Sequence, residues 1–472
     1  MPRTFYLTTT IPYVNADPHI GFALEIVQAD VVARYRRLKG DDVFFNTGTD
    51  EHGVKIYRKA LESGKMPQAY VDEYAAKFDR LKIFLNLSYD NFIRTTDAHH
   101  KKAAQEFWKR CEKSGDIYKK SYKIRYCVGC ELEKTDSELE GGRCPFHPNL
   151  ELELIEEENY FFRFSKYAPF LLDLYAKRPD LVLPDFRFNE IKRFVERGLE
   201  DFSISRLKEK MPWGVPVPGD EAQVMYVWFD ALVNYVSAIG WPDNEASFKK
   251  WWPVTQFAGK DQIRQQAAMW QAMLKSAGLS PSKQIIIHGF ITSGGQKMSK
   301  SLGNVIDPFS VVNEYGTDAL RYYLLRHVHP FEDSDFTLEK FKVVYSGELA
   351  NGLGNLTARI LTLSEKYLTE PMQKRELPSG AYDELTGTYR FDRFLDNVWT
   401  LVQGLDKRIT ETEPFKVVKN DPERGKALLK ELVAGLYSIS LLLRPCMPQT
   451  SDKIEKAILE NKKPETLFPR KE

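Results

Sequence analysis

Hydrophobic positions in the first fifty residues change their spacing in a way that predicts strand, helix and strand. Residues 3–11 alternate aromatic and β-branched side chains, the period-two pattern of a strand. After a loop over 12–18, a helix is predicted from His19 to Gly40, where glycine can form a left-handed C-terminal cap. Residues 42–46 predict a second strand, which turns at Thr47–Asp50 into another helix. This order is typical of a nucleotide-binding α/β unit.

The rest of the pattern divides the chain into segments. Residues 113–220 interrupt the α/β rhythm and indicate an insertion, after which strands are predicted at 224–228 and 284–289. From residue 345 the apolar residues follow helical spacing, which predicts a helix bundle. Its second stripe is Val398, Leu401, Leu405 and Ile409. The predicted segments are 1–112 and 221–290 for the two halves of the α/β domain, 113–220 for the insertion, 291–344 for a linking segment and 345–472 for the helical domain.

Composition narrows the class of protein. The 472 residues are too many for one core, and 43% hydrophobic with 28% charged residues is typical of globular proteins. The net charge of +1 predicts that any nucleic-acid surface is local. No apolar run approaches the ~20 residues of a membrane span, and the start lacks a signal-peptide pattern. We therefore expect a cytoplasmic protein without membrane contact, and the end at Glu472 favours a monomer.

Three of the five cysteines lie in a pattern typical of a metal site. Cys127-x-x-Cys130 is followed by Cys144-x-x-His147, and two such knuckles supply four ligands. Four protein ligands leave no open position, so we expect one structural Zn²⁺ and not a catalytic one. The alternative is a set of unrelated buried cysteines. Cys111 and Cys446 stand alone and are predicted to be buried small hydrophobes.

Two short motifs indicate chemistry on a nucleotide. His19-Ile20-Gly21 precedes a helix, where phosphates can contact free backbone N–H groups and the positive end of the helix dipole. Lys297-Met298-Ser299-Lys300-Ser301 places two cations three residues apart, and both can stabilise a leaving pyrophosphate. Glycines on both sides of the second motif predict a mobile loop. The alternatives are an ordinary helix start and an exposed charged loop.

Together these motifs resemble the class I aminoacyl-tRNA synthetases, and further residues resemble the methionyl family. The resemblance covers essentially the full length. It implies a Rossmann-like α/β nucleotide-binding catalytic domain with a zinc-knuckle insertion, followed by an all-α anticodon-binding helix bundle. It also implies the reaction: L-methionine and ATP, with Mg²⁺, give methionyl-adenylate and pyrophosphate, and the methionyl group passes to the 3′ end of tRNA(Met).

The resemblance assigns residues to these steps. His19, Lys297 and Lys300 are expected to be catalytic. The ATP-binding residues are His19, Gly21, Gly259, Asp261, Lys297, Ser299 and Lys300. The methionine pocket is expected from Ile11, Tyr13, Asp50, Trp228, Ala231, Leu232, Tyr235, Gln266 and Trp270. Asp50 can pair with the α-ammonium group, and aromatic edges suit a thioether. Anticodon contacts are expected from Asn355, Arg359 and Phe415.

Four positions depart from the family pattern. Phe22 stands where the second histidine of His-x-Gly-His is expected, which should weaken adenylate formation. Gln266 replaces a histidine of the pocket and Gln262 an apolar residue. Gln266 is expected to hydrogen-bond Tyr13 or the ligand sulfur. Phe415 replaces a tryptophan and offers a smaller surface on which a base can stack.

Other interpretations remain open from the residues alone. A tRNA-binding paralogue that has lost activation would account for Phe22 and Gln266. A nucleotidyltransferase with the same His-x-Gly motif would have no use for the anticodon residues. At single positions, Asp261 could simply cap a helix, the pocket aromatics could be plain core, and Asn355 and Arg359 could be solvated beside a core Phe415.

Overall fold

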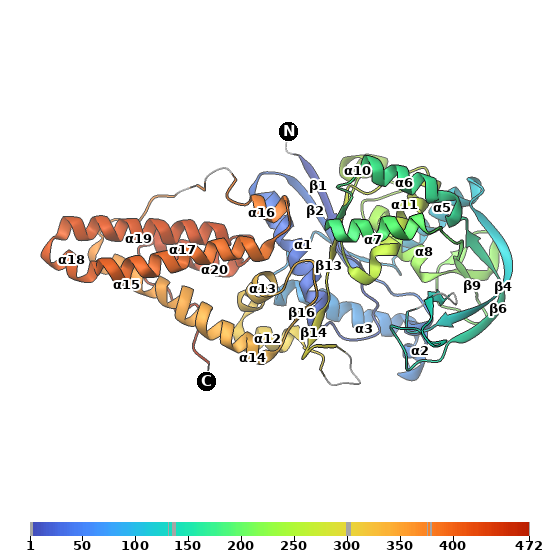
Figure 1. The fold of residues 1–472 in the computed structure, drawn as a ribbon, viewed down its shortest axis with the longest axis horizontal. Helices are drawn as coiled ribbons and strands as arrows, with labels where there is room; N and C mark the ends of the chain where they lie inside the picture. Colours follow the sequence, from blue (N-terminus) through green and yellow to red (C-terminus); the bar gives the residue numbers. More distant parts are fainter. Residues whose placement is uncertain are drawn as a thin grey trace. The chain divides into compact units, whose positions relative to one another are not determined.

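The computed structural model describes residues 3–130, 132–134, 138–298, 304–374, 376–377 and 380–471. The chain forms two compact units, each assembled from separate stretches of sequence (Figure 1). Unit 1 contains residues 1–18, 41–80 and 89–288, and unit 2 contains residues 19–40, 81–88 and 289–472.

Unit 1 is built on a six-stranded sheet in which every pair of neighbours is parallel. The order is β3 (Asn91–Arg94), β2 (Asp42–Thr49), β1 (Thr4–Thr8), β12 (Thr255–Gly259), β13 (Gln284–His288) and β7 (Val182–Leu183). The chain runs outward from β1 through β2 to β3 on one side and from β12 to β13 on the other, where the earlier strand β7 forms the edge. Ligands of such sheets bind at the carboxyl ends of the strands beside this switch point.

Helices of unit 1 bury a largely aromatic core. They include α2 (Val54–Glu62), α3 (Pro67–Asp79), α5 (Ala98–Lys113), α6 (Ala168–Lys177), α7 (Asp185–Glu196), α8 (Val227–Leu232), α9 (Asn234–Ser237), α10 (Glu245–Trp251) and α11 (Trp270–Ser276). Phe107 of α5 stacks on Trp270 with ring centroids 5.4 Å apart, and Trp108 meets Phe229 at 5.2 Å. Cys111 is buried in this core, as predicted.

The predicted insertion contributes strands to three sheets. Most of its strands form a second sheet in the order β5 (Leu132–Lys134), β4 (Ile117–Cys127), β6 (Glu153–Phe162) and β8 (Phe202–Ser203), all antiparallel. Strand β7, from the same stretch of sequence, instead extends the parallel sheet beside β13. The long β4–β6 ribbon is visible at the edge of unit 1 in Figure 1.

The strand predicted at 224–228 is wrong in two respects. Strand β11 (Asp220–Met225) ends before Tyr226, and Val227 and Trp228 begin α8. It also pairs antiparallel with β9 (Ser205–Leu207) and β10 (Pro216–Val217) and does not join the parallel sheet. A short apolar run does not distinguish a buried strand from a buried helix, and here it spans the junction of both.

Unit 2 contains α1 (Ile20–Leu38) and the helical C-terminal part, so the predicted helix bundle is confirmed (Figure 1). A small sheet has the order β15 (Gln296–Lys297), β14 (Ile291–Ser293) and β16 (Ser334–Asp335). The helices include α12 (Pro308–Tyr315), α13 (Thr317–Arg326), α14 (Leu338–Val344), the π-helix η6 (Tyr345–Gly354), α15 (Asn355–Tyr367), α17 (Phe391–Thr412), α18 (Pro414–Asn420), α19 (Pro422–Leu443) and α20 (Pro448–Leu459).

The stripe predicted on α17 is partly wrong. Leu401 is 47% exposed, whereas Val402, one residue later, is buried with Val398 and Ile409. The buried face is therefore rotated toward Phe394 and Trp399. None of the helices in the described parts of the chain is long and apolar enough to cross a membrane.

A buried arginine joins distant segments of unit 2. Arg321 of α13 is fully buried, and its Nη1 lies 2.8 Å from Oδ2 of Asp30 in α1. The guanidinium also donates to the carbonyl oxygens of Leu85, Pro445 and Cys446. Burial by itself would raise the pKa of Asp30, but Arg321 and Arg34 outweigh it and hold that pKa below its ordinary value. The carboxylate therefore stays ionised inside the core.

Replacing Arg321 with methionine should destabilise the protein. The change leaves Asp30 buried with only one of its two cationic partners, and removing one side of a buried ion pair costs about 3–5 kcal/mol. Urea denaturation followed by tryptophan fluorescence measures the loss. Arg408→Met is the matched control, because its ion pair with Glu431 is exposed and should contribute less than about 1 kcal/mol. Equal stability of the two variants would contradict the central role of Arg321.

Candidate functional site

The first motif forms the N-terminus of α1. His19 is the N-cap residue, in extended conformation, and its Nδ1 accepts the N–H of Gly21 at 3.1 Å. Desolvation lowers the pKa of His19, so the ring is neutral near pH 7. With Nδ1 acting as an acceptor, the proton of the neutral ring lies on Nε2. His19 can therefore donate one hydrogen bond from Nε2.

Glycine is required two residues after His19. A Cβ at Gly21 would lie 2.9 Å from Cε1 and 3.0 Å from Nδ1 of the imidazole. Any larger residue would displace the ring from its cap position. Phe22, which stands at the expected second histidine, is half-buried in the first turn of α1.

The expectation of free N–H groups at this helix start is wrong for its first residues. The N–H of Ile20 donates to the carbonyl of Ile306, that of Gly21 to His19 Nδ1, and that of Phe22 to the carbonyl of His19. The first backbone N–H groups of α1 are already used within the protein. The start of α1 can therefore bind a phosphate only through the helix dipole and the Nε2–H of His19.

The second motif begins at a hairpin in the same unit. Strands β14 and β15 are joined by Gly294 and Gly295, whose φ angles of 62° and 75° form a tight two-residue turn. These two glycines therefore form the turn of the hairpin, and the mobility of the loop stays a prediction. The side chain of Lys297, and residues Ser299, Lys300, Ser301 and Gly303, lie outside the described part of the structure.

Met298 connects the two motifs. Its Cε lies 3.7 Å from the position that a Cβ would occupy at Gly21. Met298, in the middle of the lysine motif, thus lies beside the start of α1, although the two are separated by 277 positions in the numbering. Within unit 2 the structure brings His19, Gly21 and Met298 together.

In unit 1, the first pocket residues lie beyond the carboxyl ends of β1 and β2. Tyr13 and Asp50 form an isolated parallel bridge, with the N–H of Val14 donating to the carbonyl of Asp50 and the N–H of Asp50 to that of Pro12. Asp50 is buried, while Ile11 and Tyr13 are half-buried. A carboxylate in this setting can pair with a ligand ammonium group.

Helix α8 adds an aromatic wall to this part of unit 1. The ring of Trp228 meets the ring of Tyr13 edge-on, with centroids 6.1 Å apart. Ala231 and Leu232 follow on the same short helix and are buried. Tyr13, Asp50 and Trp228 therefore come together as the sequence predicted.

The remaining pocket residues form a second, deeper cluster. Tyr235 and Trp270 are fully buried, with rings in an edge-on contact at 5.8 Å. Gln266 lies in the π-helical turn η4 (Gln265–Met269) directly before α11. Single π-helical turns often occur at functional sites because they widen the helix locally.

Gln266 does not make the expected hydrogen bond to Tyr13. Its Nε2 donates to the hydroxyl of Tyr235 at 2.8 Å, and its Oε1 accepts from Gln256 Nε2 at 2.8 Å. Gln256 Oε1 in turn accepts from the hydroxyl of Ser282. Both ends of the Gln266 amide are used within this chain of hydrogen bonds, which fixes the position of Tyr235.

The loop after β12 carries the candidate ribose residues. A Cβ at Gly259 would lie 2.8 Å from Oδ1 of Asp261 and 3.7 Å from the ring of His288, so a larger residue would push the Asp261 carboxylate away from this position. Asp261 is exposed, and no side chain caps the short 3₁₀ turn η3 (Lys260–Gln262), in which Gln262 also lies.

Sequence reasoning missed His288 and the pair His52–Asp230. His288 ends β13 opposite Gly259, and its place after the strand Gln284–Ile287 was the available signal. His52 Nδ1 lies 2.9 Å from Oδ2 of Asp230, with both side chains buried. Burial raises the pKa of Asp230, and His52 opposes that rise. The pair links the segment after Asp50 to α8, and no sequence pattern indicated it.

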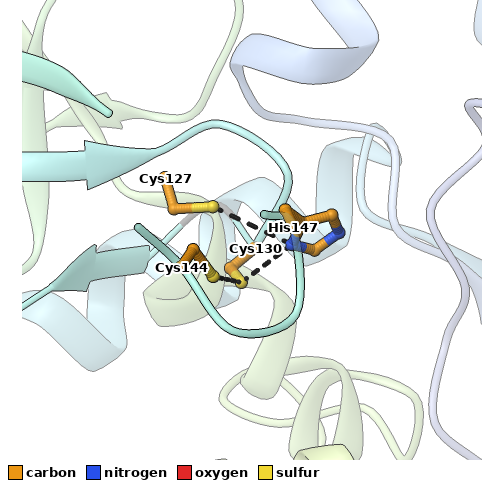
Figure 2. A group of neighbouring side chains, drawn as sticks. All are labelled: Cys127, Cys130, Cys144 and His147. Carbon is orange, nitrogen blue, oxygen red and sulfur yellow. Dashed lines mark hydrogen bonds between the residues drawn. The ribbon is translucent and has the colours of Figure 1, made fainter. Parts of the chain in front are cut away.

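The predicted metal ligands converge (Figure 2). The Sγ atoms of Cys127, Cys130 and Cys144 and a ring nitrogen of His147 all lie within 4.8 Å of one another. Nδ1 of His147 is 3.2 Å from Cys130 Sγ and 3.8 Å from Cys127 Sγ. A Cβ at Gly129 would lie 2.5 Å from the imidazole, so this glycine lets the two knuckles approach. The group could hold a metal ion.

The candidate anticodon residues lie on the helical part of unit 2. Asn355 is exposed at the start of α15, and Arg359, one turn later, pairs with Asp406 of α17. Phe415 is 41% exposed in the first turn of α18, which follows α17 directly, so it is not a core residue. Asp406 lies in the last two turns of α17, so Arg359 and Phe415 are both near its C-terminal end.

Comparisons with known proteins agree with this arrangement. The family described as tRNA synthetases class I (M) matches residues 5–151 and 149–361. The methionine–tRNA ligase of Thermotoga maritima is 42% identical over 98% of this chain and 76% of the relative. That of Thermosynechococcus vestitus is 44% identical over 96% of this chain and 90% of the relative.

One solved structure resembles this chain over nearly the full length of both proteins. It is the Mycobacterium tuberculosis methionyl-tRNA synthetase in complex with methionyl-adenylate, with a TM-score of 0.90, 35% identity and coverage of 100% of this chain and 99% of that one. The motifs, the parallel sheet, the helical C-terminal part and these similarities agree: the chain belongs to the methionine–tRNA ligases, the methionyl family of class I aminoacyl-tRNA synthetases.

Proposed function

We propose that this chain activates L-methionine with ATP and transfers it to tRNA(Met), and that the residues assigned from the sequence perform these steps. The observation that carries the proposal is the proximity of the two phosphate-directed motifs. Met298 lies against Gly21, beside an imidazole whose Nδ1 is already occupied and whose Nε2 carries the proton. The neutral Nε2–H donor of His19 and the lysine motif belong to the same unit, and together they can bind the phosphates of ATP.

In the first step, a carboxylate oxygen of methionine attacks the α-phosphorus of ATP, and the bond to the pyrophosphate oxygen breaks. His19 would donate from Nε2 to a phosphate oxygen, and Lys297 and Lys300 would stabilise the charge that moves onto pyrophosphate. Mg²⁺ carried with ATP would neutralise further phosphate charge. No side chain acts as a nucleophile, so catalysis consists of positioning and charge stabilisation.

We assign methionine binding to unit 1. Asp50 would pair with the α-ammonium group, and Ile11, Tyr13 and Trp228 would enclose the thioether. Ala231 and Leu232 would complete the wall, with Tyr235, Gln266 and Trp270 as its buried support. Gly259 and Asp261 would bind the ribose of ATP. Support comes from the position of Ile11, Tyr13, Asp50, Gly259 and Asp261 at or just beyond the carboxyl ends of β1, β2 and β12.

We also propose that the four-residue cluster holds one structural Zn²⁺. Three thiolates and an imidazole are the donors that zinc prefers, and four protein ligands leave no position for water. Zinc would then fold the loop after β4, in which the described side chains of Phe146 and Leu150 are exposed. The second step, attack of the tRNA 3′-terminal hydroxyl on the adenylate, needs tRNA selection, which we assign to Asn355, Arg359 and Phe415.

Location, subunit number and domain boundaries remain predictions. The cytoplasm suits a protein in which all five cysteines are unpaired, because disulfides are rare in reducing compartments. A monomer is expected, and sedimentation would measure it. The boundaries at residues 112, 220, 290 and 344 stay as predicted from the sequence.

Methionine should drive ATP–pyrophosphate exchange in the wild-type protein, and Phe22→His should increase its rate by up to about 100-fold. The reason is that one transition-state hydrogen bond is worth a few kcal/mol. Phe22→Leu is the matched control, because it keeps an apolar side chain and adds no donor. Leucine, isoleucine and homocysteine serve as comparators. Exchange only in Phe22→His, or in neither protein, would favour the paralogue that binds tRNA without activating methionine.

Arg359→Ala should reduce aminoacylation of tRNA(Met) by about 10–100-fold and leave ATP–pyrophosphate exchange unchanged. Hydrogen bonds to a charged group contribute about 1.5–3 kcal/mol, and Arg359 is assigned only to tRNA. Arg408→Ala, on the same helical part and also in an ion pair, should keep both activities. Loss of exchange in Arg359→Ala would contradict the assignment. Absence of charging in the wild type would revive the nucleotidyltransferase alternative.

Elemental analysis of the purified protein should find one zinc ion per chain. Cys130→Ser should lose the metal, because three ligands bind Zn²⁺ less tightly than four, and proteolysis near residues 127–147 should become faster. Cys111→Ala should keep the metal, since Cys111 lies in the core of unit 1 away from this cluster. Zinc-free protein with wild-type protease resistance would refute a structural role for the ion.

A further inference from the structure

The lysine motif begins in a very small β-sheet. The hairpin strands β14 and β15 have three and two residues, and β14 pairs on its other side with the two-residue strand β16. Isolated hairpins of this size are not stable by themselves. Something beyond the ladder hydrogen bonds must therefore fix the place where the chain enters the motif.

Asp335 supplies contacts of this kind. It lies in β16, opposite Thr292 of β14, and its carboxylate reaches to the hairpin turn. Oδ1 accepts the backbone N–H of Gly295 at 2.8 Å and the hydroxyl of Thr292 at 3.1 Å. Oδ2 accepts from Nζ of Lys340 in α14 at 2.8 Å. Both carboxylate oxygens are used, and one of them holds the turn itself.

The charge of this carboxylate is stabilised by the same contacts. The N–H of Gly295, followed by the Lys340 ammonium, holds the pKa of Asp335 below its ordinary value. Charge-assisted hydrogen bonds are roughly twice as strong as neutral ones. Lys340 belongs to α14, which continues without a break into η6 and α15, so the carboxylate is anchored to a long helical element.

The hairpin leads directly to the proposed phosphate site. Two residues after Gln296, the side chain of Met298 reaches the start of α1 at Gly21. A shift of the turn would therefore move Lys297 of β15 and Met298. Displacements of about 1 Å can cost about 100-fold in rate when a reaction depends on positioned charges.

We propose that Asp335 is a positioning residue for adenylate formation, which holds the Gly294–Gly295 turn so that the lysine motif enters the phosphate site at a fixed place. Lys340 acts through Asp335 by fixing its carboxylate. Neither residue touches the substrate. The inference rests on the proposed activity, because it assigns a role within methionine activation.

The test compares methionine-dependent ATP–pyrophosphate exchange in the wild type, Asp335→Ala, Asp335→Asn, Lys340→Met and the double variant Asp335→Asn/Lys340→Met. Asp335→Ala should lower kcat about 10–100-fold, with KM for methionine within twofold of the wild type. Asp335→Asn keeps an oxygen for Gly295 and loses the ion pair, so its kcat should fall less. The double variant should be no slower than the slower single variant, because both changes remove one shared contact.

Glu339→Gln is the matched control. It removes one carboxylate from an exposed position directly before Lys340, and its kinetics should equal those of the wild type. Urea denaturation of every variant separates loss of position from loss of folding. If Asp335→Ala does not fold, Asp335→Asn and Lys340→Met carry the test.

The outcomes are separable. A wild-type protein that exchanges, together with Asp335→Ala within twofold of it, overturns this inference and leaves the proposed activity standing. A rise in KM for methionine equal to the fall in kcat also overturns it, because a positioned phosphate loop does not act on methionine binding. A wild-type protein without exchange overturns both the activity and this inference.

Discussion

The buried ion pair between Arg321 and Asp30 is the constraint on which the organisation of unit 2 depends. A guanidinium with no exposure to water must satisfy its donors within the protein, and Arg321 does so with Asp30 and three carbonyl oxygens. These groups belong to α1, to the segment 81–88 and to the turn between α19 and α20. Helix α1 therefore belongs to the same unit as the lysine hairpin, although the sequence places it between two strands of unit 1.

With this arrangement, each unit carries the residues for a different part of the proposed reaction. Unit 2 carries the groups directed at phosphate, namely His19 at the start of α1 and the motif that begins at the β14–β15 hairpin. Unit 1 carries the groups directed at the amino acid and the ribose, at the carboxyl ends of its parallel strands. Local details in each unit limit mobility: a cap hydrogen bond orients His19, and an amide chain through Gln266 fixes Tyr235.

Sequence reasoning succeeded where a local pattern has one physical meaning. The paired spacing at Cys127 and Cys144 allows few structures other than converging knuckles, and the structure gathers these ligands. Sequence reasoning failed where the structure of a segment depends on how it packs. The apolar run before Trp228 crosses from a strand into α8, and the exposed Leu401 differs from the buried Val402 by one position on a helix. Periodicity alone does not resolve either case.

The sequence by itself determined the family motifs, the strand–helix–strand order at the N-terminus, the helical C-terminal part, and the residue types that suit nucleotide, methionine and metal. Those features are local, because short-range spacing and side-chain chemistry specify them. Only the tertiary structure decided that α1 belongs to unit 2, that Gln266 bonds to Tyr235 and not to Tyr13, and that Asp335 reaches the turn at Gly295. These contacts join residues distant along the chain or across a sheet, and their partners are selected by burial and by hydrogen-bond satisfaction, which no linear pattern records.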